Sequence, residues 1–361
     1  VASILVRVMG MIYRIPMTAI IGDKGNGFYS YAYSVYTILL LLSSYSLPLA
    51  VSKMVSAKAQ LGQWRNVKRV FICAIAFAIG IGTTFGLIVL IGAQFFTRVF
   101  FHSELAAIAL RFMAPTILIM ALLGVFRGFF QGLQNTLPTA VSQIVEGLIN
   151  AIMSVVFAYF LFDFGHGMDA ASGTTDLGYA WGAAGGAIGT GAGALAGLIF
   201  CFILFVAYRK ILAVNISRDK TGTQQEYGDI FRLMLSIALP VILSTALYNL
   251  IELVDGSLFN NIMASKGMED VKDSMWGAYN AKALLLVHIP VSISSAMAVS
   301  LVPTLTAAYA LGDEQTAKSK VHAILRFISI LAFPSAVGLL VLANPIIKTL
   351  FSGDTSAAST Y

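Results

Sequence analysis

The chain has 361 residues, of which 58% are hydrophobic and only 11% are charged, whereas soluble domains carry about 25% charged residues. A soluble protein of this size could not bury so much apolar surface in one core. The composition therefore excludes a soluble enzyme, a disordered chain and a nucleic-acid-binding module, and it predicts an all-α, polytopic integral membrane protein. Cys73 and Cys201 both lie in apolar runs, so neither a disulfide framework nor a cysteine metal site is expected.

About nine apolar runs follow one another, each long enough to cross about 30 Å of hydrocarbon with roughly 20 residues. They cover 1–21, 28–51, 70–96, 105–130, 138–162, 178–208, 230–254, 277–303 and 321–347. These runs are too long for strands and lack the alternation of a barrel, so we expect helices. The chain opens at Val1, already in an apolar run and without a cleavable signal peptide, so we expect the natural start to precede it.

The segments between the runs alternate in positive charge. Roughly eleven Lys and Arg residues fall in 52–69, 209–229 and 311–320, against about five in the opposite set of segments. Because positively charged loops stay on the cytoplasmic side, these three segments and the N-terminus are predicted to be cytoplasmic.

An internal repeat emerges when the sequence is shifted by 250 residues, which aligns 27–101 with 277–351 without a gap. Any two membrane segments can be slid into register, but the matched hydropathy and loop positions favour a true repeat. Six spans separate the copies, which predicts a parallel repeat of two six-helix lobes. We expect an N-terminal lobe over 1–208, a cytoplasmic linker over 209–229, and the first three helices of a second, incomplete lobe over 230–361.

Among the basic residues within or at the ends of apolar runs, four are functional candidates, because an ionisable group there costs several kcal/mol unless it faces protein or water. Arg7 and Arg14 lie seven residues apart and share a face of the first span. Lys282 lies in the eighth span, and Arg127 closes the fourth. Snorkelling to the interfaces is the alternative for Arg7 and Arg14, and anchoring at the cytoplasmic interface is the favoured interpretation of Arg127.

Three acidic residues also fall in apolar runs. Glu146 lies in the fifth span, and Glu252 and Asp255 lie three residues apart on one face of the seventh. Such a pair can hold a cation or a proton, but pairing with an arginine of a neighbouring helix is equally compatible with the spacing.

The second span carries a tyrosine stripe. Tyr29, Tyr33 and Tyr36 follow helical spacing, a pattern that can stack on sugar rings or line a wet cavity. An interfacial aromatic belt is the alternative, and it is the better interpretation for Tyr29.

Two familiar patterns do not support chemistry. The glycine-rich run over 182–197 resembles a dinucleotide-binding loop, but no strand precedes it, and small residues every four positions favour close helix contact. The four histidines show no metal-ligand spacing. We find no nucleophile–base pair and no Walker motif, so no catalytic residue, metal or cofactor is predicted, and transport energy would come from an ion gradient, the membrane potential or the substrate gradient.

Two groups of motifs carry a family resemblance. The first comprises Arg7-Val8-Met9-Gly10, Tyr13-Arg14-Ile15-Pro16, residues 21–29 and Leu47-Pro48-Leu49-Ala50-Val51-Ser52-Lys53, and the second comprises residues 126–135 with Pro138-Thr139-Ala140, Ser142-Gln143 and Glu146. Together they resemble the polysaccharide-exporter branch of the multidrug/oligosaccharidyl-lipid/polysaccharide flippase superfamily, with stage V sporulation protein B-like and lipid II flippase-like members as the nearest match. The motifs cover most of 1–160.

The resemblance implies two lobes of six helices around a central cavity in the bacterial cytoplasmic membrane, and alternating-access flipping of undecaprenyl-pyrophosphate-linked sugars. Arg7 and Arg14 would engage the pyrophosphate, since guanidinium groups make strong charge-assisted contacts to phosphate oxygens. Lys282, Tyr33 and Tyr36 would complete the cavity. The expected coupling or gating residues are Glu146, Glu252, Asp255 and Arg127.

The chain also departs from the family pattern. Asn150 stands where relatives often carry an arginine, and Ser43-Ser44-Tyr45-Ser46 stands where the better-known lipid II flippases carry an arginine pair. The expected partners are a lipid-linked sugar, the bilayer and a coupling ion, with no nucleic acid and a monomeric transporter. The alternatives are a cation-coupled multidrug and toxin extrusion-type exporter with an acidic cavity, a non-transporting scaffold of envelope synthesis, and an integral-membrane enzyme.

Overall fold

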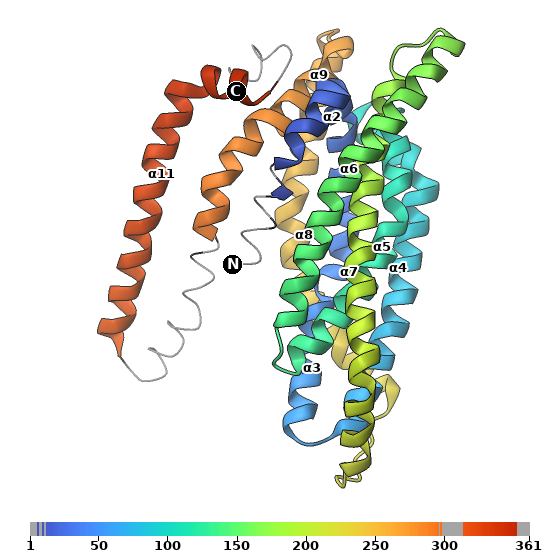
Figure 1. Cartoon of the computed structure of the whole chain (residues 1–361), viewed down its shortest axis with the longest axis vertical. Coiled ribbons are helices and arrows are strands. Elements are labelled where there is room, and N and C mark those ends of the chain that lie inside the picture. Colours follow the sequence, from blue (N-terminus) through green and yellow to red (C-terminus); the bar gives the residue numbers. More distant parts are fainter. Residues whose placement is uncertain (1–5, 7–8, 11, 296, 298–312, 352–361) are drawn as a thin grey trace.

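Every regular element that the structure, a computed structural model, describes is a helix (Figure 1). The described residues are 6, 9–10, 12–295, 297 and 313–351. The helices are α2 (Arg14–Leu40), the π-helical η1 (Leu41–Tyr45), α3 (Leu47–Gln60), α4 (Trp64–Phe101), α5 (Ala106–Gly132), α6 (Leu137–Ser172), α7 (Leu177–Arg218), α8 (Tyr227–Ser265), α9 (Glu269–Ala278), the π-helical η2 (Tyr279–Ala283) and α11 (Glu314–Leu350). A further helix covers 284–295.

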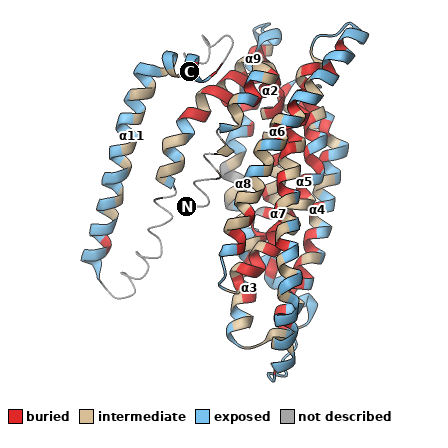
Figure 2. Cartoon of the chain, in the orientation of Figure 1, coloured by how far each residue is buried: buried red, intermediate tan, exposed pale blue. Residues whose placement is uncertain are grey.

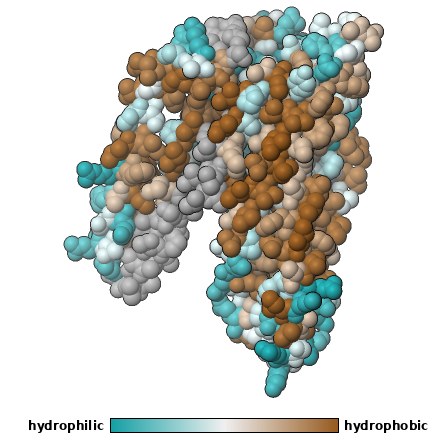
Figure 3. Space-filling view, viewed as in Figure 1, coloured by the Kyte–Doolittle hydropathy of each residue, from teal (hydrophilic) through white to brown (hydrophobic). Residues whose placement is uncertain are grey.

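The surface of these helices is apolar over most of their length. Brown, hydrophobic residues cover the middle of the helices in Figure 3, and hydrophilic residues gather toward their ends. Large side chains such as Leu340 and Ile91 are 84% and 80% exposed, which suits lipid and not water. Much of α11 is exposed in Figure 2. The chain is a multi-pass membrane protein.

Six helical stretches among the described residues are long and apolar enough to span a membrane, against about nine expected runs. The difference has three sources. The end of the run 1–21 from Arg14 onward and the whole of 28–51 fall in one helical stretch, Arg14–Gln60. Helix α8, which contains the expected run 230–254, is not among the six. The run 277–303 extends beyond the described residues.

The chain folds back within α2 at Gly22, whose φ of 61° and ψ of −175° are not helical. In a straight helix, the 19 steps from Arg14 to Tyr33 would span about 28 Å. Both residues instead line one cavity of about 330 Å³. The sharp bend therefore needs only one non-helical residue, Gly22. The apolar runs 1–21 and 28–51 instead predict a short loop between them.

Small residues of α7 let it pack directly against α6. A Cβ atom at Gly185, Gly189 or Gly193 would overlap atoms of α6, including the backbone of Ala158 and Ser154. The interpretation of the glycine-rich run as a helix-contact surface is confirmed, because only glycine permits this backbone separation.

The segment expected as a linker, 209–229, is helical in its first half because α7 continues to Arg218. The non-helical stretch after it is bound to the start of α4. Asp219 accepts a hydrogen bond from the backbone N–H of Arg65 at 2.9 Å, and the Arg69 guanidinium donates to the carbonyl of Gln225 at 2.6 Å. Asn66 donates to the carbonyl of Thr223 at 3.1 Å. These contacts hold the linker at the lower end of the bundle in Figure 1.

The two copies of the repeat meet at the opposite end. A Cβ atom at Gly27 would overlap the backbone oxygen of Asp273, and one at Gly277 would overlap the backbone oxygen of Asp23. The two contacts correspond to each other through the repeat: Gly277 is Gly27 shifted by 250 positions, and Asp273 is Asp23 shifted by 250 positions. Such a reciprocal contact is the mark of a two-fold relationship between the copies, and it supports the parallel repeat predicted from the sequence.

Candidate functional site

A cavity of about 330 Å³ lies between α2 on one side and α8, η2 and the helix over 284–295 on the other. Its first wall contains Arg14, Tyr29 and Tyr33, and its second contains Glu252 of α8 and His288 of the helix over 284–295. The full lining is Gly10, Tyr13, Arg14, Tyr29, Ser30, Tyr33, Glu252, Asn280, Leu284, Leu285, His288 and Ser292.

Arg14 stands among phenol groups in this cavity. It makes a side-chain hydrogen bond with Tyr13 and lies within electrostatic range of Tyr29 and Tyr33. No ion pair joins Arg14 to a carboxylate in the part of the chain that the structure describes. The fold-back at Gly22 creates this arrangement, because it brings the arginine of one arm of α2 against the tyrosines of the other.

A second cavity, of about 660 Å³, adjoins the first. Four residues line both cavities: Glu252, Asn280, Leu284 and His288. Asp255, Phe259 and Trp276 line the larger one alone. The Ser34 hydroxyl of α2 donates to the Glu252 carboxylate at 3.4 Å. The two volumes lie within the range of small-ligand sites.

Three more residues were predicted to line the cavity: Arg7, Tyr36 and Lys282. Arg7 is outside the described residues. Tyr36 is 2% exposed, with its ring centroid 5.8 Å from that of Tyr33. Lys282 is also 2% exposed, and its ammonium donates to the Asp23 carboxylate at 2.7 Å. Neither Tyr36 nor Lys282 is among the residues lining these two cavities, and their roles in substrate binding stay predictions.

Arg127 and Glu146 pair with each other across α5 and α6. The guanidinium Nη2 lies 2.7 Å from a Glu146 carboxylate oxygen, and Nε donates to the Ser142 hydroxyl at 2.8 Å. The sequence did not predict this pair: it left an arginine partner open for Glu252 and Asp255, and neither of these forms an ion pair in the part of the chain that the structure describes. The coupling or gating role of Glu146, like that of Arg127, stays a prediction.

The end of the molecule where the repeat copies meet holds polar contacts that sequence reasoning missed. The Lys272 ammonium donates to the carbonyls of Phe101 and His102 at 2.8 and 2.9 Å, covering the C-terminal carbonyls of α4. Burial lowers the pKa of Lys272 from its ordinary value. The Tyr31 hydroxyl donates to the Asn260 amide oxygen at 3.0 Å. No spacing rule could have paired residues so far apart in the chain.

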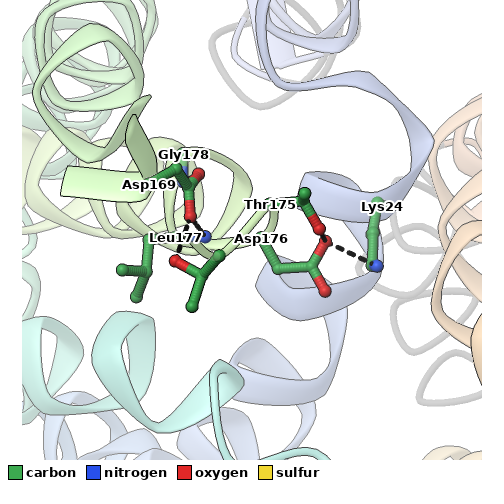
Figure 4. Close-up of polar contacts among 7 residues, drawn as sticks. Lys24, Asp169, Thr175, Asp176, Leu177 and Gly178 are labelled. Carbon is green, nitrogen blue, oxygen red and sulfur yellow. Dashed lines mark hydrogen bonds and ion pairs between the residues drawn. The ribbon is translucent and has the colours of Figure 1, made fainter. Parts of the chain in front are cut away.

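The loop between α6 and α7 closes the same end of the bundle (Figure 4). Lys24 donates to the Asp176 carboxylate at 2.7 Å. Asp169 accepts hydrogen bonds from the backbone N–H groups of Leu177 and Gly178, at 3.0 and 2.9 Å. These bonds satisfy donors at the start of α7 that have no intrahelical partner.

The described residues contain no group of three or more histidine, cysteine, aspartate or glutamate side chains that could hold a metal ion.

Comparison with known proteins assigns the chain to a family. The polysaccharide biosynthesis protein family matches residues 1–308, and a second family of the same description matches residues 271–355. The chain belongs to the polysaccharide biosynthesis protein family. This agrees with the resemblance seen in the motifs around Arg14 and Arg127.

Two curated relatives come from Bacillus subtilis. The lipid II flippase MurJ is 26% identical over 97% of this chain and 64% of the relative. The stage V sporulation protein B is 24% identical over 99% of this chain and 66% of the relative. The chain thus spans slightly less than two thirds of the length of each.

Solved structures share the fold. An inward-facing MATE family multidrug resistance transporter of the MOP superfamily superposes with a TM-score of 0.70 at 14% identity, covering all of this chain and 74% of the other. A MOP superfamily transporter from Pyrococcus furiosus, described as having a binding pocket of reverse polarity, gives a TM-score of 0.54 at 15% identity over 99% of this chain and 76% of the other. At these identities the likeness concerns the fold alone.

Proposed function

We propose that this protein is a flippase that moves undecaprenyl-pyrophosphate-linked oligosaccharide across the bacterial cytoplasmic membrane by alternating access, and that it is not an enzyme. The family and the names of the two curated relatives support a role in this chemistry. The substrate would be a peptidoglycan precursor or a surface-polysaccharide unit. Its headgroup would enter the cavity while the prenyl tail stays in lipid.

The observation that carries this proposal is the position of Arg14. Its guanidinium lines a cavity between α2 and the helices α8, η2 and 284–295, and it has no carboxylate partner among the described residues. An unpaired guanidinium in a cavity of low dielectric constant binds pyrophosphate oxygens strongly. Tyr29 and Tyr33 beside it offer ring faces to a sugar. Arg7 would add a second positive charge on the same helix face.

The charge distribution supports an orientation of the protein in the membrane. The basic segment 52–69 and the linker bound to it lie at one end of the molecule, opposite the end where Gly27 and Gly277 meet. The positive-inside rule makes the first end cytoplasmic. The N-terminus would then be cytoplasmic as well.

A second candidate is a cation-coupled exporter of organic cations. It is favoured by Glu252 and Asp255, which line the larger cavity. An acidic cavity suits a cationic drug, whereas Arg14 opposes it.

Ligand binding by the full chain in nanodiscs separates these candidates. The probes are undecaprenyl-pyrophosphate-disaccharide and tetraphenylphosphonium, each measured with the unchanged chain, with Arg14→Gln and with the exposed control Arg111→Gln. We expect the prenyl lipid to bind, and Arg14→Gln to weaken it about 10- to 100-fold, the equivalent of about 1.5–3 kcal/mol for a charged hydrogen bond. The control should bind normally.

Three results would reject the flippase assignment. Unchanged lipid affinity in Arg14→Gln would show that the cavity lined by Arg14 does not bind the lipid headgroup, and the flippase assignment would lose the observation that carries it. Tight binding of tetraphenylphosphonium without lipid binding would favour the exporter. Binding of neither probe would favour a non-transporting scaffold.

A further inference from the structure

The two adjoining cavities carry opposite charges on their two sides. Arg14 lines the smaller cavity from α2, and Asp255 lines the larger one from α8. Glu252 lines both and therefore stands between them. A ligand that carries only negative charge would meet one favourable wall and one repulsive wall. The charge distribution instead suits a headgroup with both signs.

The acidic side has room for a cation. Glu252 and Asp255 lie three residues apart on one face of α8, about 4.5 Å along the helix axis. Both side chains are exposed. Within the described residues, Asp255 has no hydrogen bond or ion pair, and Glu252 has only the weak donor Ser34, at 3.4 Å. Two neighbouring carboxylates repel each other, and a cation bound between them relieves that repulsion.

An independent feature of the same cavity also indicates a ligand. Trp276 lines the larger cavity and is 6% exposed, and its indole Nε1–H has no acceptor among the described residues. Its ring lies 5.2 Å from that of Phe259 and 5.7 Å from that of Tyr279, measured between centroids. Aromatic rings attract an ammonium group and also stack on sugars.

We propose that Glu252 and Asp255 bind a primary ammonium group of the transported headgroup while Arg14 binds its pyrophosphate. The inference rests on the proposed flippase function and narrows its substrate class to amine-bearing headgroups. The amine can belong to an unacetylated amino sugar or to an amino-acid side chain of an attached peptide. Two-point recognition of this kind selects against headgroups that lack the amine, because they leave the acidic pair without a counter-charge.

Paired probes that differ only in the amine test this proposal. One pair is prenyl-pyrophosphate-linked disaccharide with a lysine-containing peptide, with the lysine amine free or acetylated. The other is prenyl-pyrophosphate-linked glucosamine and its N-acetyl form. Binding is measured to the full chain in nanodiscs, to Asp255→Asn, to Glu252→Gln, and to Asp270→Asn, an exposed acidic residue of α9 outside both cavities.

We expect the unchanged chain and Asp270→Asn to bind the amine form of at least one pair about tenfold more tightly than its acetylated form. Asp255→Asn and Glu252→Gln should lose this preference and keep their affinity for the acetylated form. The pair that shows the preference identifies the source of the amine. Because Asp255 makes no polar contact in the described structure, Asp255→Asn should fold normally.

Equal affinity for both members of both pairs, with binding still dependent on Arg14, would overturn the inference and leave the flippase function intact. A preference that survives both acidic substitutions would overturn it as well. Absence of all prenyl-pyrophosphate binding would reject the proposed function, and the inference with it.

Discussion

The Lys282 ammonium lies 2.7 Å from the carboxylate of Asp23, a residue 259 positions earlier in the chain. Lys282 belongs to η2, in the second repeat copy, and Asp23 follows the bend at Gly22, four residues before the first copy begins. The pair therefore joins the second copy to the segment leading into the first, at the end where Gly27 and Gly277 also meet. An alternating-access cycle would have to separate these groups when that end opens.

Breaking this pair should destabilise the protein. Asp23→Asn leaves the nearly inaccessible Lys282 charge without its carboxylate, which costs about 3–5 kcal/mol for a buried pair. Replacing both residues, as Asp23→Asn with Lys282→Met, should cost less than the sum of the single changes. Thermal unfolding in detergent provides the measurement, and strictly additive effects would show that the two groups do not interact.

A methyl group at Gly277 should separate the two repeat copies. In Gly277→Ala the added Cβ would overlap the backbone oxygen of Asp23, which a rotamer change cannot relieve. We expect a loss of about 1–3 kcal/mol, typical of overpacking. Gly338→Ala in α11, where nothing lies within 4 Å of the new Cβ, is the matched control and should unfold at or slightly above the original temperature. Equal behaviour of the two variants would contradict the close contact.

The bend at Gly22 should depend on glycine. Its φ of 61° and ψ of −175° lie in a region that residues with a Cβ adopt at a cost of about 1–3 kcal/mol. Gly22→Ala should therefore lower the unfolding temperature and weaken binding at Arg14, whose place beside Tyr29 depends on the bend. Gly228→Ala, in open space at the start of α8, should change neither. Unaltered stability in Gly22→Ala would argue against the bend.

Asp219 should hold the linker in place down to low pH. Hydrogen bonds from the Arg65 backbone and from Thr221 lower the pKa of Asp219 to about 2, below its ordinary value of about 3.9. Because the pKa is lower in the folded state than in the unfolded state, the charged carboxylate stabilises the folded state at every pH above the unfolded pKa. This contribution is lost as the pH falls through the folded pKa of about 2. Limited proteolysis of 219–226 should thus proceed at a constant low susceptibility between pH 3 and 8.

Asp219→Asn should raise cleavage in this segment across that whole range, since the charged acceptor is absent at every pH. Asp229→Asn, at the start of α8, is the comparison variant with the same loss of charge. A wild-type linker that becomes more susceptible as the pH falls from 5 to 3, where an aspartate of ordinary pKa becomes protonated, would contradict the lowered pKa of Asp219, once the protease's own pH dependence is corrected for.

Several boundaries could be predicted because hydropathy and helix signals are local. The apolar run 105–130 corresponds to α5, Ala106–Gly132, and the glycine-rich run is the close-contact face of α7. The basic segment 52–69, expected as a loop, lies mostly in α3 and α4, and α7 continues to Arg218. Neither continuation was predicted, since basic residues fit a loop equally well.

The membrane class, the family and the repeat follow from the sequence alone, because apolar run length, motif spacing and internal similarity are properties of a linear chain. The partners of the charged residues were decided by the tertiary structure. Arg14, Arg127 and Lys282 are all basic residues in or at the edge of apolar runs, yet one lines a cavity, one pairs with Glu146 and one pairs with Asp23. Charge pairing depends on separations of a few ångströms between distant segments, and only the packing of the helices sets those separations.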